Sequence, residues 1–198
     1  MTFTSQGCAQ AHAILTARFR LLFILVITCL CVSEQPTFSA DSVSKEYQLK
    51  AAFLYNFTKF VTWPSKKFEE SNNKLVIGII GHNPFGNELA EITQGRTVGG
   101  RDIQVQYITS IEAAHSVNLL FIPNAEERKV KDHLRSLHAA SVLTVGETDH
   151  FASLGGIISF SVNADKIRFE INREEAFNAS LKISPQLLKL AISVRKTK

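Results

Sequence analysis

The chain has 198 residues, of which 45% are hydrophobic and 20% charged. That length suits one domain with a real core and is too short for two ordinary domains plus a leader. The formal net charge is +4, and the basic residues are spread out apart from a cluster at Arg195, Lys196 and Lys198. Nucleic acid is therefore not an expected partner, because no basic footprint exists for it.

A leader is predicted at the N-terminus. Arg18 and Arg20 precede an uninterrupted apolar run, Leu21–Val32, and a basic segment followed by an apolar one is typical of a secretory signal peptide. The run is about a dozen residues long, below the roughly 20 that a membrane-spanning helix needs. We expect residues 1–40 to be a cleaved signal peptide with a short linker, and residues 41–198 to form a domain exported to the periplasm.

The leader also holds every cysteine of the chain. Cleavage after Ser33 or after Ala40 is compatible with the sequence, and acylation of Cys29 or Cys31 would instead make the protein a lipoprotein. The third cysteine is Cys8. A mature domain without cysteine forms no disulfide even in an oxidising compartment, so burial alone must stabilise it. Removal of the leader lowers the formal net charge from +4 to +3.

The first element predicted for the domain is a long amphipathic helix. Seven side chains recur at steps of three and four, which places them on one helical face: Tyr47, Lys50, Phe53, Leu54, Phe57, Phe60 and Val61. Trp63-Pro64 should end the helix, because the residue before a proline is pushed out of the α region. Such a stripe is typical of a helix packed on a core.

Buried parallel strands are predicted next. Leu75–Ile80 is a continuous apolar run, typical of a parallel strand covered on both faces, and a helix is expected over Pro84–Thr93 because proline suits a first turn. Ile103–Tyr107 alternates apolar and polar residues and is expected at or near a sheet edge. A short helix, a buried strand, a longer helix, a buried strand and a short helix follow over Ile111–His115, Asn118–Ile122, Glu126–Ala139, Val142–Val145 and Asp149–Leu154.

The pattern changes towards the C-terminus. Two consecutive strands, Gly156–Asn163 and Lys166–Asn172, indicate a β-hairpin, and Asn172 can cap the next helix with Glu175 at its third position. Ser184-Pro185 opens a last helix with the core face Leu187, Leu188, Ala191 and Ile192. Together these elements predict an α/β fold, a three-layer sandwich whose mixed sheet is parallel first and antiparallel at its C-terminal hairpin.

Two segments are candidates for binding. The loop after the first buried strand carries His82, Asn83 and Gly86, at the place where α/β sheets bind ligands. It lacks a dinucleotide or P-loop motif, so a structural turn is the alternative. Strand Lys166–Asn172 has a polar face that includes Arg168 and Glu170. That face is either the solvated side of a half-buried strand or a partner-docking surface.

Catalytic and metal-binding patterns are missing from the sequence. The histidines form no HxH or HExxH set, and no domain cysteine completes a zinc site. The serines lie in no GxSxG elbow, and the adjacent glutamate pairs are typical of helix starts. We therefore predict no catalytic residue, no metal and no cofactor.

Five stretches in this order resemble the YfiR family, also called DUF4154. They are LVIGIIGHNPFGNEL, VGGRDIQVQYI, NLLFIPNAEE, VLTVGETDHFASLGGIISF and KIRFEINREEAFNASLKISPQLLKLA, preceded by AAFLYNFTKFVTWP. The most specific pieces are AAFLYNFTKFVTWP, the GGxI turn at Gly155–Ile158, KIRFEIN and LKISPQLLKLA. The resemblance covers roughly residues 44 to 195. Family members often carry cysteine pairs in the domain, which this chain lacks.

The resemblance implies a non-enzymatic periplasmic regulator that binds and restrains a membrane diguanylate cyclase, lowering cyclic-di-GMP signalling. The partner would be the periplasmic domain of that cyclase or of a sensor kinase. The docking surface is expected at Arg168, Glu170, Arg173 and Glu174, and a homodimer stays open. The rival hypotheses are a periplasmic small-molecule sensing or binding module that uses the His82–Gly86 loop, and a hydrolase whose site the sequence does not reveal. A closed apolar pocket at the carboxyl edge of the sheet would favour the small-molecule module.

Overall fold

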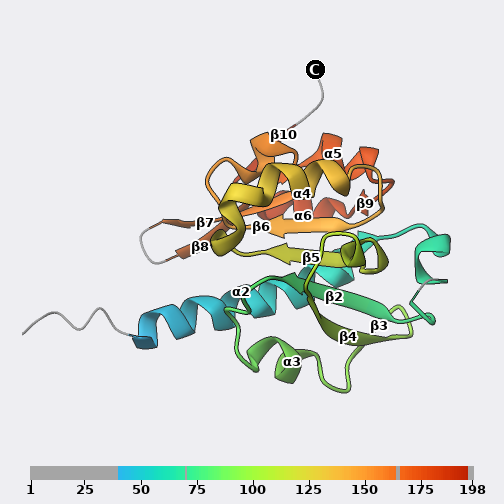
Figure 1. Ribbon diagram of the computed structural model, residues 1–198, viewed down its shortest axis with the longest axis horizontal. Coiled ribbons are helices and arrows are strands. Elements are labelled where there is room, and N and C mark those ends of the chain that lie inside the picture. The colour runs from blue at the N-terminus through green and yellow to red at the C-terminus, as the bar shows by residue number, and fades with distance from the viewer. Residues whose placement is uncertain (1–39, 70, 164–165, 196–198) are drawn as a thin grey trace, which may run out of the picture. The chain divides into compact units, whose positions relative to one another are not determined.

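The computed structural model describes residues 40–69, 71–163 and 166–195 (Figure 1). Its centre is an eight-stranded mixed sheet in the order β10-β8-β7-β6-β5-β2-β4-β3. The strands span Leu75–Ile80 (β2), Thr97–Val98 (β3), Arg101–Ile108 (β4), Leu119–Ile122 (β5), Leu143–Gly146 (β6), Ile158–Asn163 (β7), Lys166–Asn172 (β8) and Ser193–Arg195 (β10). The α/β fold class is confirmed.

As predicted, the central strands of the sheet are parallel and the C-terminal hairpin is antiparallel; the edge strand β3 is also antiparallel to β4. β2 has β4 on one side and β5 on the other, and β5, β6 and β7 continue in parallel. β8 returns antiparallel to β7, with Asn163 opposite Lys166. β4 lies next to the edge, which is formed by the two residues of β3.

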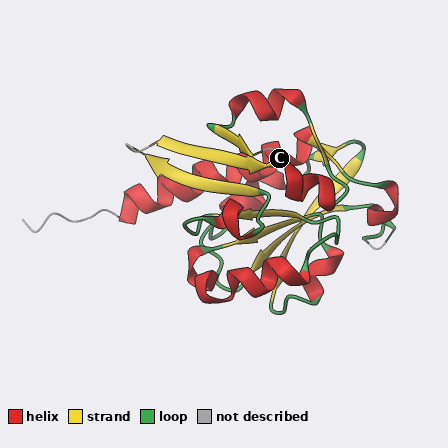
Figure 2. Cartoon of the chain, turned by 90° about the horizontal axis from the view of Figure 1, so that it is seen from above, coloured by secondary structure: helices red, strands yellow, loops and turns green. Residues whose placement is uncertain are grey.

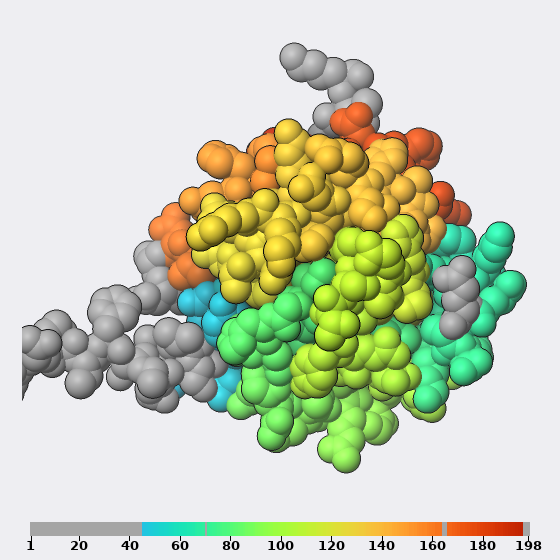
Figure 3. Space-filling model, in the orientation of Figure 1, coloured from blue at the N-terminus to red at the C-terminus, as the bar shows by residue number. Residues whose placement is uncertain are grey.

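Two separate hydrophobic clusters cover the two faces of the sheet, which confirms the three layers. One contains the long helix α2 (Ala40–Phe60) with α3 (Glu88–Thr93), α5 (Arg173–Asn178) and α6 (Pro185–Leu190). The other contains α4 (Val130–Ser136) and the 3₁₀ helices η2 (Ala113–Ser116) and η4 (Phe151–Leu154). The segments between β5 and β6, yellow in Figure 3, cover this second face.

The predicted face of α2 packs on the hairpin. Leu54 and Phe57 are fully buried, and the ring of Phe57 lies 5.7 Å from Phe160 of β7 and 5.1 Å from Phe169 of β8. Val61, however, lies outside the helix. It belongs to β1 (Val61–Thr62), which pairs antiparallel with β9 (Lys182–Ile183). The helix therefore ends before Trp63-Pro64 because the chain turns into this short second sheet.

Several predicted helices have different bounds. The short helices predicted over Ile111–His115 and Asp149–Leu154 are the 3₁₀ helices η2 and η4. α3 begins at Glu88 rather than Pro84, because Asn83 Oδ1 accepts a hydrogen bond from Phe85 N at 2.9 Å and folds the intervening residues into turns. The helix predicted over Glu126–Ala139 is the 3₁₀ helix η3 (Asn124–Lys129) followed by α4.

The last helix is shorter than predicted. α6 ends at Leu190, and Ile192, expected on its core face, is 57% exposed. The chain after it forms β10, which pairs parallel with β8, so that Arg195 lies in a strand. Both predicted caps are present: Asn172 Oδ1 accepts from Glu175 N, and Ser184 Oγ from Leu187 N, each at 3.2 Å.

The predicted signal peptide and the three cysteines lie outside the described residues, so processing and export stay predictions. Within the described part of the chain, no helix combines the length and the apolar character needed to cross a membrane.

Candidate functional site

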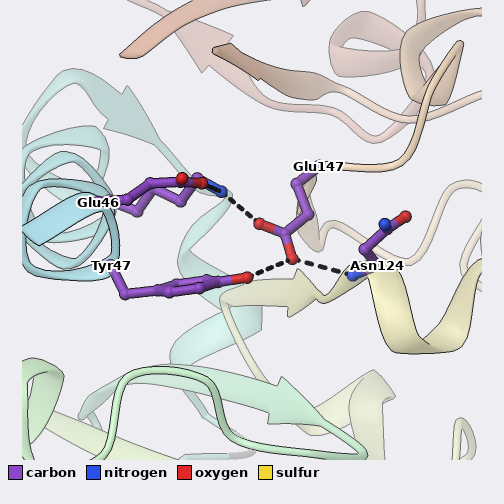
Figure 4. A network of polar contacts seen from close by, with 5 residues as sticks. Glu46, Tyr47, Asn124 and Glu147 are labelled. Carbon is purple, nitrogen blue, oxygen red and sulfur yellow. Dashed lines mark hydrogen bonds and ion pairs between the residues drawn. The ribbon is translucent and has the colours of Figure 1, made fainter. Parts of the chain in front are cut away.

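A buried polar network lies at the carboxyl ends of β5 and β6 (Figure 4). Its centre is Glu147, the first residue after β6, whose side chain is 7% exposed. Its carboxylate accepts from Lys50 Nζ at 2.5 Å, from the Tyr47 hydroxyl at 3.0 Å and from Asn124 N at 2.9 Å. One carboxylate thus joins α2 to the loops that follow β5 and β6.

The network explains why a lysine, Lys50, occurs in an apolar helix face. Its side chain is 3% exposed, and its ammonium also lies 2.5 Å from Glu46 Oε1. A buried ammonium must be paired, because its desolvation is otherwise prohibitive. With two carboxylates for one lysine, the network retains negative charge.

The same charge acts on the neighbouring tyrosine. Burial, followed by the negative charge of Glu147 and the hydrogen bond to it, raises the pKa of Tyr47 well above its usual range. The hydroxyl therefore stays protonated at all physiological pH values and serves as a donor to the carboxylate.

Next to the network is a cleft of about 410 Å³. It lies between α2, the loop after β6 and the hairpin, which projects on the same side of the molecule as the N-terminal part of α2 (Figure 2). Its lining residues are Glu46, Tyr47, Lys50, Asn124, Glu147, Thr148, Asp149, His150, Ser159, Phe160, Ser161, Val162 and Glu170. The lining includes four carboxylates and one lysine. Buried Thr148 Oγ1 has no hydrogen-bond partner among the described residues.

Two glycines allow the loop beside this cleft to pack on a buried aromatic ring. The ring of Phe151, which is fully buried, lies against the backbone of Gly146 and Gly156, so that a Cβ added at either glycine would overlap the ring. Because only glycine leaves room for this approach, the loop from Glu147 to His150 starts and ends at one aromatic ring.

The predicted ligand loop lies apart from this cleft. His82 and Gly86 are exposed. Asn83 Nδ2 donates to Gly86 O at 2.8 Å within the loop and to the Tyr107 hydroxyl of β4 at 3.4 Å. Phe85 is buried, with ring centroids 5.5 Å from Tyr47 and 4.8 Å from Phe121. None of the three predicted residues lines the cleft, and ligand binding by them stays a prediction.

The predicted docking residues lie along β8 and the start of α5. Arg168, Arg173 and Glu174 are exposed, and Glu170 is partly exposed, with Oε2 3.7 Å from Arg195 Nε on β10. Of the four, Glu170 alone lines the cleft. The fold therefore brings Glu170 together with Glu147 and Asp149, which the sequence analysis had not singled out.

Two features of the sequence could have pointed to Glu147. Lys50 stands within an apolar stripe, which demands a buried acidic partner, and Glu147 follows a buried strand at the edge where polar site residues gather. A metal site is not formed at this place: in the described ranges, no three His, Cys, Asp or Glu side chains are arranged to hold an ion.

The fold is that of a mixed α/β domain, and the polar cleft at the carboxyl edge of its sheet is a candidate binding site. A YfiR/HmsC-like family model matches residues 47–192, and the chain belongs to that family. This membership supports, in broad terms, the role of a periplasmic regulator.

The chain is similar to two solved structures. A conserved domain protein from Vibrio cholerae O1 biovar eltor is 12% identical with a TM-score of 0.51, and an ABC domain in complex with L-Trp from Streptococcus pneumoniae is 13% identical with a TM-score of 0.48. Each match covers 75% of this chain and 60% of the other. At such identities the first shows the fold alone, and the second adds no argument.

Proposed function

We propose that this protein is a non-enzymatic periplasmic regulator that binds the periplasmic part of a membrane-bound diguanylate cyclase and restrains cyclic-di-GMP production. Family membership supports the regulatory role. The observation that carries the docking surface is the projecting hairpin, whose polar face leads directly into the exposed start of α5.

The regulation is a binding equilibrium. The protein holds the cyclase inactive as long as it binds the inactive state more tightly than the active one. A signal that reduces this difference in affinity releases the enzyme. Arg168, Glu170, Arg173 and Glu174 provide charges of both signs, which set orientation and partner choice more than total affinity.

Deletion of the gene tests the proposal. Cellular cyclic-di-GMP should rise, and wild-type protein should restore the low level. A Glu170→Lys allele should fail to restore it at normal protein abundance, whereas Glu91→Lys, an exposed charge reversal on α3, should succeed. Full complementation by Glu170→Lys would place the docking surface elsewhere, and an unchanged cyclic-di-GMP level after deletion would refute the regulator.

The alternative is a periplasmic small-molecule sensing module. A cleft does lie at the carboxyl edge of the sheet, where such modules bind ligands. Its lining is rich in charged and hydroxyl side chains, unlike the closed apolar pocket expected for this function. The alternative gains ground only if deletion leaves cyclic-di-GMP unchanged.

A further inference from the structure

Strand β7 is longer than its neighbour β6. β6 ends with Gly146 opposite Ser159, whereas β7 continues to Asn163. From Phe160 onwards β7 pairs with β8 alone. No loop backbone or side chain in the described ranges is hydrogen-bonded to the main chain of residues 161–163 on the side that β6 has left.

The register shows which main-chain groups face this open edge. Asn172 N donates to Ile157 O, so odd-numbered residues of β7 turn their hydrogen-bonding groups towards β8. In an antiparallel pair these groups alternate along each strand. The N–H and C=O of Val162 therefore point away from β8, into the cleft. The side chain of Val162 is 51% exposed.

This edge carries none of the usual protection against strand addition. Proteins commonly protect open edges with charged side chains or proline. The outer edge of β8 has such protection, because Lys166 and Arg168 lie within its unpaired stretch. The open stretch of β7, residues 161–163, contains neither a charge nor a proline.

The cleft along the β7 edge is acidic. Glu46, Glu147, Asp149 and Glu170 line it, and Lys50, the one lysine among the lining residues, is already paired with two of them. Opposite charge favours association and specifies the partner. An open strand edge and an acidic wall, found in the same cleft, select for the same occupant.

We propose that an extended basic segment of a partner protein adds as a strand to the open edge of β7. Its main chain pairs with β7 around Val162, in the manner of β-augmentation. Its Lys or Arg side chains reach Asp149, Glu170 and the Glu46–Glu147 network. This names the kind of segment that the regulated partner contributes, and so rests on the proposed function. The two proposals are tested separately. Peptide binding can fail while deletion of the gene still raises cyclic-di-GMP, and peptides can bind although deletion leaves cyclic-di-GMP unchanged.

The test titrates purified protein into labelled peptides and records fluorescence anisotropy. The probe is a hexapeptide of alternating lysine and valine, and the comparison peptide carries glutamate in place of lysine. The basic peptide should bind, and added salt should weaken its binding. Two N-methylated versions, one modified on the valines and one on the lysines, should differ, because only alternate N–H groups face the strand edge. Equal binding of both, tighter binding of the acidic peptide, or no binding at millimolar concentration would overturn the proposal.

Proline variants locate the edge. Val162→Pro removes an N–H at the β7 edge and should lower affinity about tenfold, as expected for one lost hydrogen bond. Ile167→Pro removes an outward N–H from the other edge of the hairpin, where Ile192 N donating to Phe169 O shows the same alternation. It should leave affinity within about twofold. Equal effects of the two variants would refute the assignment.

A charge variant and a mass measurement complete the test. Asp149→Lys changes an exposed loop residue outside any strand and should weaken binding even if Val162→Pro fails to fold. Unchanged affinity for Asp149→Lys would contradict the acidic wall. Sedimentation could instead show that the wild-type protein is a dimer and that Val162→Pro is a monomer. That result would assign the edge to a second copy of this chain and overturn the basic segment as its occupant.

Discussion

Replacement of Lys50 by methionine tests the buried network most directly. The substitution keeps an unbranched side chain of similar length in a site that is 3% exposed, and removes the cation between Glu46 and Glu147. Breaking a buried ion pair by removing one partner typically costs about 3–5 kcal/mol. Glu147 keeps its hydrogen bonds from Tyr47 and from the Asn124 N–H, so we expect the lower end, about 3 kcal/mol.

Urea unfolding of Lys50→Met, with its melting temperature as a second measure, gives the result. A loss of about 3 kcal/mol corresponds to a fall of about 6–12 °C for a domain of this size. The double variant Lys50→Met, Glu147→Met removes both charges and should recover part of the loss, because an apolar pair can replace a buried ion pair. If the single variant melts within about 2 °C of wild type, the network is solvated and the reasoning is wrong.

Three further predictions concern the core, the redox state and the pH response. Phe57→Ala should cost about 3–5 kcal/mol in urea unfolding, since it removes a fully buried ring; unchanged stability would contradict the packing of α2 on the hairpin. The mature domain should melt at the same temperature with and without reductant, and a difference above about 2 °C would mean that a leader cysteine is retained. Burial opposes ionisation of Glu126, but hydrogen bonds from Lys129 and His133 outweigh it and lower the pKa of its carboxyl. The ionised Glu126 carboxylate therefore stabilises the fold above the unfolded pKa of about 4.3. This stabilisation is lost as the pH falls through the folded pKa. Glu126→Gln should thus unfold more easily than wild type at pH 7 and equally at about pH 2; a constant difference across this range would exclude the effect.

Continuous apolar runs made the parallel strands predictable. β2, β5 and β6 are buried on both faces, so their local composition reports their environment. The hairpin and both caps follow equally from local chemistry. The predicted start of α3 was wrong because it depends on one hydrogen bond, which the Asn83 side chain accepts from Phe85 N. β10 was missed because its three residues are defined by pairing with β8 rather than by their own pattern.

The site was less predictable than the fold. Lys50 and Glu147 are 97 residues apart, and the sequence alone shows one half of such a pair without naming the other. The open edge of β7 depends on where β6 stops relative to β7. Such a difference in length across a sheet is a tertiary property, whereas charge and alternation along Lys166–Asn172 are visible locally.

The ring of Phe151 between Gly146 and Gly156 has a consequence for local unfolding. Both ends of the loop that carries Glu147, Asp149 and His150 are held by this one side chain, so the loop cannot fray residue by residue from either end. It should open as one cooperative unit. Its amides would then exchange with deuterium at a shared rate, and one substitution at Phe151 would release the acidic floor of the cleft all at once.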